Sequence, residues 1–169
     1  RFVVFELSSI KEDEQMLSIV TSTIMHEFER VMAKVKEFKY LVIDEAWKSI
    51  TNKAMEPKIM ELWRTARKHS ASAVVVTQNV EDIISSPIIK NVIINNSSTK
   101  ILLDQSNNKN NFAPIAGLFG LSQKETALVL STRKGQNPAY SYREVFIQIG
   151  RKSGAYGIEA SKAEQIAYQ

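Results

Sequence analysis

Continuous apolar runs alternate along this chain with longer segments in which apolar residues recur every three or four positions. The continuous runs lie at 2–5, 40–43, 73–77 and 100–103. Runs of this kind are typical of strands that are buried on both faces of a parallel sheet. The segments 16–35 and 57–69 have helical spacing and predict two amphipathic helices. Strand, helix and strand in this order predict parallel strand pairs joined by crossover helices.

The last third of the chain has a different pattern. Residues 139–149 alternate between apolar and polar positions, which predicts a strand exposed on one face. A turn at 150–154 then returns the chain and predicts an antiparallel hairpin. Shorter helices are expected from Ser86-Pro87 to Asn95, from Ser122 and from Ser161. The predicted fold class is therefore α/β, with a mostly parallel sheet, helices on both faces and an antiparallel C-terminal hairpin.

Composition limits the number of domains and the kinds of site that the chain can have. A chain of 169 residues with 44% hydrophobic content predicts one domain, and its net charge of +4 selects no particular partner. Cysteine is absent, which excludes disulfides and thiolate metal sites. The apolar runs are far shorter than the roughly 20 residues that cross a bilayer, so we expect a soluble chain. Because the sequence begins at Arg1 and enters a strand-like run at once, we also expect it to be a piece of a larger protein.

Two adjacent carboxylates, Asp44 and Glu45, follow the apolar run 40–43 directly. An apolar strand that ends in an acid pair is a Walker B pattern. In nucleotide-hydrolysing proteins the first acid holds Mg²⁺, usually through water, and the second polarises the attacking water. A solvated turn in which Asp44 caps a helix and Glu45 favours its dipole explains the pair equally well. The phosphate-binding motif G-x-x-x-x-G-K-[ST], the usual companion of this pattern, occurs nowhere in the chain.

Two further residues are candidates for the same chemistry. Gln78 follows the next apolar run and would lie beside the acid pair if the two strands are neighbours, where its amide could orient water against a γ-phosphate. Arg67 is the candidate arginine finger of the crossover helix. Cations are favoured at a helix C-terminus in any case, which is the simpler explanation for Arg64 and Lys68. His26 and His69 lack metal-ligand spacing and are expected at the surface.

Taken in order, three segments resemble the motor domain of TraG/TraC-like conjugative-transfer ATPases, which energise type IV secretion and are related to the FtsK and HerA motors. The segments are 40–47 (YLVIDEAW), 61–68 (ELWRTARK) and 73–83 (AVVVTQNVEDI), and the resemblance continues through 98–103, 120–125 and 143–149. The resemblance implies a RecA-like P-loop NTPase fold. It also implies that residues 1–169 form the C-terminal part of a single ATPase domain.

The resemblance further implies the ligands, the partners and the site residues. ATP and Mg²⁺ are the cofactors, with Asp44 as the Mg²⁺-organising acid and Glu45 as the catalytic acid. Gln78 matches the polar residue after the sensing strand. Arg67 matches an arginine of the Arg-Lys motif, acting in its own subunit or in a neighbour. The complete protein is expected to work as a homo-hexamer with secretion-channel proteins, in the cytoplasm and peripheral at the inner membrane, with DNA as a further potential contact.

Three alternatives to a secretion ATPase stay open. A DNA-translocating motor of the FtsK/HerA kind would have the same catalytic core. A Mg²⁺-dependent nuclease could use Asp44, Glu45 and a nearby lysine, but it leaves Gln78 and the Arg-Lys motif unexplained. A non-catalytic docking module is the third alternative. Because the phosphate-binding loop is missing, the chain alone is expected to bind nucleotide poorly and to be nearly inactive.

Overall fold

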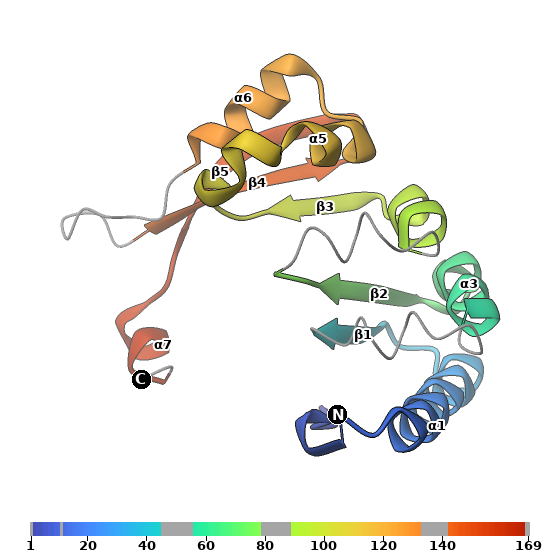
Figure 1. Cartoon of the computed structure of the whole chain (residues 1–169). Helices are drawn as coiled ribbons and strands as arrows, with labels where there is room; N and C mark the ends of the chain where they lie inside the picture. The colour runs from blue at the N-terminus through green and yellow to red at the C-terminus, as the bar shows by residue number, and fades with distance from the viewer. Residues whose placement is uncertain (1, 11, 45–55, 79–88, 133–141, 168–169) are drawn as a thin grey trace. The chain divides into compact units, whose positions relative to one another are not determined.

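The computed structural model describes residues 2–10, 12–44, 56–78, 89–132 and 142–167, shown in Figure 1. The chain divides into two compact units, Arg1–Asn96 and Ser97–Gln169. In the first unit the elements are η1 (Ser8–Ile10), α1 (Glu14–Lys34), β1 (Lys39–Asp44), α3 (Glu56–Thr65), η2 (Ala66–His69), β2 (Ala71–Val76) and the π-helical η3 (Ile89–Ile94). In the second unit they are β3 (Thr99–Leu102), η4 (Ser106–Asn111), α5 (Ala113–Phe119), α6 (Gln123–Ser131), β4 (Tyr142–Ile149), β5 (Lys152–Glu159) and α7 (Lys162–Ala167).

Helix α1 begins at a side-chain cap and ends among cations. The carboxylate of Asp13 accepts a hydrogen bond from the backbone N–H of Met16 at 2.9 Å, which satisfies one of the free donors of the first turn. Lys34 lies in the last turn, where the helix dipole favours positive charge. Leu17, Met25 and Met32 are its buried residues. The long amphipathic helix predicted before the acid pair is confirmed.

The strands β1 and β2 are parallel neighbours, in register from Lys39 opposite Ala71 to Asp44 opposite Val76. The connection between them includes α3 and η2, as the spacing predicts. Ile59 and Leu62 of α3 are only 1% exposed, so this helix contributes its apolar face to the core. Ser70 leaves η2 in the left-handed conformation (φ 50°) and redirects the chain into β2. The predicted strand–helix–strand unit is therefore confirmed.

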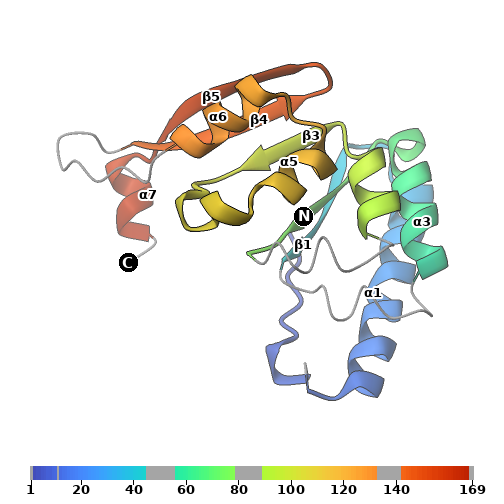
Figure 2. The same cartoon turned by 45° about the horizontal axis from the view of Figure 1, so that its top comes forward.

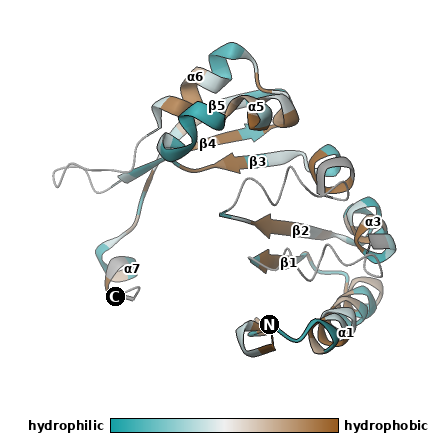
Figure 3. Cartoon of the chain, viewed as in Figure 1, coloured by the Kyte–Doolittle hydropathy of each residue, from teal (hydrophilic) through white to brown (hydrophobic). Residues whose placement is uncertain are grey.

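Helices cover one face of the β1–β2 pair. Alternate strand residues pack against the buried cluster of the first unit. These strand residues are Leu41, Ile43, Ala73 and Val75, and the cluster consists of Met25, Met32, Ile59, Leu62, Ala66, Ala71 and Ile93. The side chains on the opposite face, Tyr40, Val42, Val74 and Val76, are exposed. They are nevertheless mostly apolar, in line with the hydrophobic colouring of β1 and β2 in Figure 3. In the part of the chain that the structure describes, helices cover one face of this pair, so the predicted helices on the second face stay a prediction.

Lys39 joins the two helical segments that precede the strands. Its ammonium group donates to the carbonyl of Val35, just after α1, at 2.7 Å and to the carbonyl of His69, at the end of η2, at 2.6 Å. Its backbone N–H donates to the carbonyl of Ser70 at 3.1 Å. Carbonyls at helix ends lack helical partners, and a cation satisfies them while complementing the dipole. One lysine therefore fixes where both strands begin.

The second unit contains an antiparallel sheet with the order β3-β4-β5. A two-residue turn joins β4 to β5, and Gly150 supplies its positive φ of 58°. The predicted C-terminal hairpin is confirmed. The strand predicted at 100–103 forms as β3, but its partner is the antiparallel β4, so it does not extend the parallel pair in the described residues. An apolar run indicates burial and does not determine strand direction, which explains this error.

Helices of the second unit pack on one side of its sheet. Figure 2 shows α6 running along β4 and β5, and α6 contacts both strands. The buried residues of this unit come from the strands and from the helical segments: Phe112, Ile115, Ala116, Val129, Thr132, Val145, Phe146 and Gln148. Helix α5 was not predicted, because its seven residues include Pro114 and Gly117 and resemble a loop in sequence.

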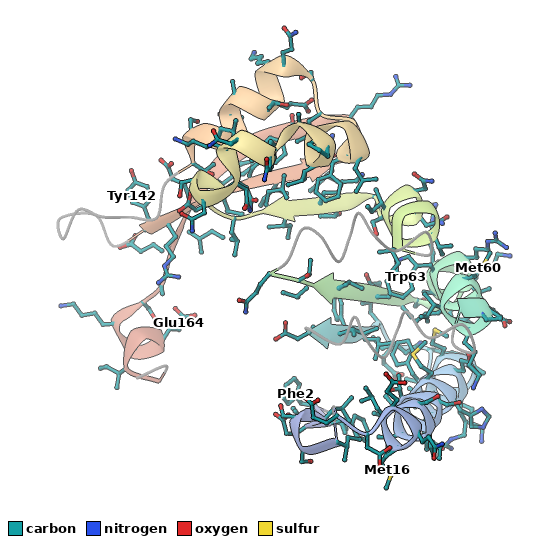
Figure 4. The ribbon with its side chains drawn as sticks, in the orientation of Figure 1. Phe2, Met16, Met60, Trp63, Tyr142 and Glu164 are labelled. Carbon is teal, nitrogen blue, oxygen red and sulfur yellow. The ribbon has the colours of Figure 1, made fainter. Side chains whose placement is uncertain are left out.

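The strand predicted at 2–5 does not form. Residues 2–5 belong to no helix or strand, and the side chains of Phe2 and Val4 are 91% and 70% exposed; Phe2 is labelled in Figure 4. A strand is stabilised by hydrogen bonds to a neighbour, and no neighbour pairs with this segment in the described residues. The predicted helix start at Ser86-Pro87 lies outside the described residues, and the helical segment after it, η3, is π-helical.

The two helices expected from Ser122 and Ser161 form, and each begins with a capping box. In α6 the hydroxyl of Ser122 accepts from the backbone N–H of Glu125, whose carboxylate accepts in return from the Ser122 N–H at 2.8 Å. The Ser153 hydroxyl of β5 also donates to Glu125, at 2.6 Å, and so joins the helix start to the hairpin. Ser161 and Glu164 repeat the box at α7, where Figure 4 labels Glu164.

Glu125 makes the second unit sensitive to acid. The hydrogen bond from Ser153, followed by those from the backbone and hydroxyl of Ser122, holds the pKa of this carboxyl below its usual value of 4.5. A carboxylate whose pKa is lowered on folding stabilises the fold above its unfolded pKa, and this stability is lost as the pH falls through the folded pKa. Because Gln can still accept the capping bond but carries no charge, and the carboxylate is solvated, we expect Glu125→Gln to lower the free energy of unfolding by only about 0.5 kcal/mol at neutral pH.

Denaturant unfolding at neutral pH and at pH values below 4.5 measures this effect. The difference between Glu125→Gln and the parent chain should shrink in acid, because the parent carboxyl is then protonated. Lys124→Gln, which changes the neighbouring exposed residue, is the matched control and should show no such pH dependence. A Glu125→Gln difference that stays constant across the range would contradict the assignment.

Candidate functional site

Asp44 and Gln78 lie at the same edge of the parallel pair. Asp44 is the last residue of β1 and is level with Val76, the last residue of β2. Gln78 follows two residues after Val76. Neighbouring strands are about 4.8 Å apart, so the register places the acid and the amide around one strand-end position. Two of the residues that the sequence singles out thus belong to the carboxyl ends of neighbouring strands, where α/β sheets bind ligands.

The side chain of Asp44 belongs to the open face of the pair. Strand residues alternate between the two faces, and Asp44 shares its face with Tyr40 and Val42, which are 66% and 60% exposed. Asp44 and Gln78 are themselves exposed, and neither has a hydrogen-bonding or ionic partner among the residues described. An exposed carboxylate and an exposed amide are groups that can bind a hydrated cation and a water molecule.

The described side chains at this edge could bind Mg²⁺ together with water and phosphate oxygens, but they are too few to bind a metal through protein ligands alone. No group of three or more His, Cys, Asp or Glu side chains that could hold a metal occurs in the described part of the chain. Mg²⁺ usually keeps several waters and is bound by one or two carboxylates together with substrate phosphates. One carboxylate at a strand end, with Glu45 next in sequence, matches that requirement. Glu45 itself lies outside the described residues.

Arg67 is at the other end of the strands. It lies in η2, before the start of β2, and β2 continues for six residues before it reaches the level of Asp44. At about 3.3 Å per residue the strand alone separates the two ends by roughly 16 Å. The side chain of Arg67 is exposed. Within one chain, therefore, the structure does not bring Arg67 together with Asp44 and Gln78.

Other polar residues have structural or surface positions. His26 and His69 are exposed on α1 and η2, as expected for residues without metal-ligand spacing. Lys39, on the same strand as Asp44, is held by two backbone carbonyls at the opposite end of that strand. It is therefore not available as the lysine of a nuclease site around Asp44.

The open apolar face that ends at Asp44 was not predicted from the sequence. Tyr40, Val42, Val74 and Val76 form it, with exposed fractions between 37% and 66%. A continuous apolar run shows that both faces of a strand are apolar, but it does not show which of them helices cover. Only the packing of α1, α3 and η2 distinguishes the faces.

No helix in the described residues is both long and apolar enough to cross a membrane.

Comparisons with known proteins agree with the motif series. The sequence model of the TraG P-loop domain matches residues 1–169. Protein TraC of Escherichia coli (strain K12) is 31% identical over 112 residues, which cover 63% of this chain and 13% of TraC. The structure of VirB4 of Thermoanaerobacter pseudethanolicus matches with a TM-score of 0.70 and 26% identity, over 97% of this chain and 43% of the VirB4 chain. The chain thus spans less than half the length of these relatives.

Two substitutions on neighbouring residues test the face on which Asp44 lies. Val42→Lys places a charge on the open face, so the free energy of unfolding of this chain should fall by less than about 1 kcal/mol. Ile43→Lys places the same charge against the buried cluster, where we expect a loss of about 3 kcal/mol or more. Denaturant unfolding of both variants measures the difference, and equal losses would show that the faces are assigned wrongly.

Proposed function

Because the chain belongs to the TraG P-loop domain family, we propose that it is part of the ATP-hydrolysing motor of a conjugative type IV secretion system. The resemblance to TraG/TraC-like ATPases that the ordered motifs indicate is confirmed by this family match. The motor would power assembly of the channel or transfer of its substrate. The observation that carries the proposal is the position of Asp44 and Gln78 at one edge of a parallel strand pair.

Each residue of the edge has a defined task in this proposal. Asp44 holds Mg²⁺ through water, and the metal neutralises charge on the β- and γ-phosphates of ATP. Glu45 polarises the attacking water. Gln78, which follows the neighbouring strand β2, orients that water with its amide. Catalysis of this kind depends on positioning and on electrostatic stabilisation, which rigid strand ends supply.

The phosphate-binding loop would come from elsewhere in the longer protein. The chain has no G-x-x-x-x-G-K-[ST] motif and spans 43% of the VirB4 chain that it matches. We propose that the segment carrying this loop packs on the open face formed by Tyr40, Val42, Val74 and Val76, which would complete a RecA-like sheet with helices on both faces. This would bury the apolar face and bring phosphates to Asp44. By itself the chain should bind nucleotide poorly.

We propose that Arg67 acts in trans. Its place at the amino end of the strands separates it from Asp44 of the same chain, so a role in hydrolysis requires a neighbouring subunit. A homo-hexameric ring, on the cytoplasmic side of the inner membrane and in contact with channel proteins, would provide that neighbour. An arginine that reaches the phosphates from the next subunit stabilises the charge of the transition state.

The three alternatives differ in how well the described residues support them. An FtsK/HerA-type motor would have the same strand-end site, and hydrolysis stimulated by DNA rather than by channel proteins would favour it. A nuclease would need a lysine near Asp44, and Lys39 cannot serve because it is held at the other end of β1. A nuclease would also leave Gln78 and the Arg-Lys motif unexplained. If the chain were a docking module, the location of Asp44 and Gln78 at the same edge of the strand pair would have no explanation.

Substitutions in the complete protein test the catalytic roles. Asp44→Asn and Glu45→Gln should each reduce steady-state ATP hydrolysis at least about a hundredfold, because they remove charge on which the transition state depends. Asp13→Asn, which changes an acid on a helix cap away from the site, should retain near-parental turnover. Unchanged turnover in both site variants would refute the proposal.

Mixing two inactive variants tests the role of Arg67. Chains with Arg67→Ala and chains with Glu45→Gln should each be inactive alone. In mixed rings, a site with an intact Glu45 can face an intact Arg67 of the neighbour, so part of the activity should return. Lys68→Ala serves as the matched control and should stay active without mixing. If mixing restores nothing although mixed assemblies form, Arg67 does not act in trans.

A further inference from the structure

Lys39 holds the end of η2 with both its side chain and its backbone. Its ammonium group donates to the carbonyl of His69 at 2.6 Å, and its backbone N–H donates to the carbonyl of Ser70 at 3.1 Å. The same ammonium group donates to the carbonyl of Val35, which follows α1, at 2.7 Å. One residue of β1 therefore ties the end of η2 to the end of α1.

The other end of η2 is fixed in the core. Ala66, its first residue, is 6% exposed and belongs to the buried cluster of the first unit. The carbonyl of Ala66 accepts a hydrogen bond from the backbone N–H of Ser70, which closes the turn. Arg67 thus lies between a residue buried in the core and a residue held by Lys39. A backbone anchored on both sides within so short a segment presents its side chains from a fixed position.

Arg67 points out of this anchored turn. Its side chain is exposed, and it has no hydrogen-bonding or ionic partner among the residues that the structure describes. A guanidinium group binds phosphate oxygens through several N–H donors at once. Binding costs less free energy when the backbone that carries the group is already ordered. The anchor formed by Lys39 supplies that order before any partner arrives.

We propose that Lys39 is a positioning residue for Arg67: it holds η2 so that the guanidinium group meets the γ-phosphate bound by a neighbouring subunit. This inference rests on the proposed function, in which Arg67 acts in trans. Lys39 acts only through the backbone of η2. Because a group misplaced by about 1 Å can cost up to a hundredfold in rate, loss of these bonds should slow the chemical step and leave ATP binding unchanged.

A second lysine of the first unit offers a matched control. The ammonium group of Lys58 donates to the hydroxyl of Ser22 at 2.6 Å and so joins α3 to α1. Lys58 lies near the start of α3, at the end of that helix away from η2. Lys58→Met therefore removes a lysine contact between two elements of the same unit without releasing the end of η2.

Substitutions in the complete protein test the role of Lys39. Lys39→Met removes the donors but keeps an unbranched side chain, so kcat for ATP hydrolysis should fall about tenfold or more while KM stays near the parental value. Lys39→Arg can still donate to two carbonyls and should restore most of kcat. Lys39→Gln, a milder change that keeps a polar end, should show the same pattern as Lys39→Met and provides the test if that variant fails to fold. Lys58→Met should keep the parental kcat.

Mixed rings show which subunit Lys39 serves. In equal mixtures of Lys39→Met and Glu45→Gln chains, about a quarter of the sites combine an intact Glu45 with a correctly held Arg67 of the neighbour, so activity should rise above that of either variant alone. In mixtures of Lys39→Met and Arg67→Ala chains every site faces a defective arginine, and activity should not rise. Damage by Lys39→Met to the site of its own chain would give the reverse pattern.

The mixture of Arg67→Ala and Glu45→Gln chains is the reference for these results. If the reference regains activity and the mixture of Lys39→Met and Glu45→Gln does not, Lys39 does not position Arg67, although the proposed function holds. If neither mixture regains activity, Arg67 does not act in trans and the inference falls with that proposal. A kcat for Lys39→Met equal to that of Lys58→Met, or a change in KM alone, would also overturn the inference.

Discussion

The parallel register of β1 and β2 is the constraint on which the candidate site depends. It is fixed at the amino end, where Lys39 binds the carbonyls of Val35 and His69, and it places Asp44 level with Val76 at the other end. The helices α1 and α3 cover one face of the strand pair, and the strands pack against the buried residues of these helices. Backbone pairing therefore positions the acid and the amide, and no direct contact between their side chains is required.

The same geometry separates residues that the sequence places close together. Arg67 precedes Gln78 by only eleven positions, yet a whole strand lies between their ends of the sheet. A parallel strand pair has two chemically different edges, and residues before and after a strand belong to opposite ones. A role for Arg67 in hydrolysis is thus tied to assembly with another subunit.

Local rules in the sequence predicted much of this fold. Helical spacing indicated α1 and α3, the Ser-x-x-Glu pattern indicated the start of α6, and the two-strand crossover followed from element order. Three features were beyond such rules. The direction of β3, the absence of a strand at 2–5 and the open face of β1–β2 depend on which partner is present, and an apolar run does not encode its partner. At the site, the register confirmed that β1 and β2 are neighbours and that Asp44 lies level with Val76. The closeness of Gln78 to Asp44 stays a prediction, as do the roles of these two residues and of Glu45 and Arg67.

The register of β1 and β2 determines where relatives of this chain can differ in length. The offset between Asp44 and Gln78 is determined by the pairing from Lys39–Ala71 to Asp44–Val76 and by the two residues after β2. Residues inserted or deleted between Asp44 and the start of α3 change the length of the crossover without shifting that offset. Relatives can thus differ in length between these two positions and still align the acid with the amide.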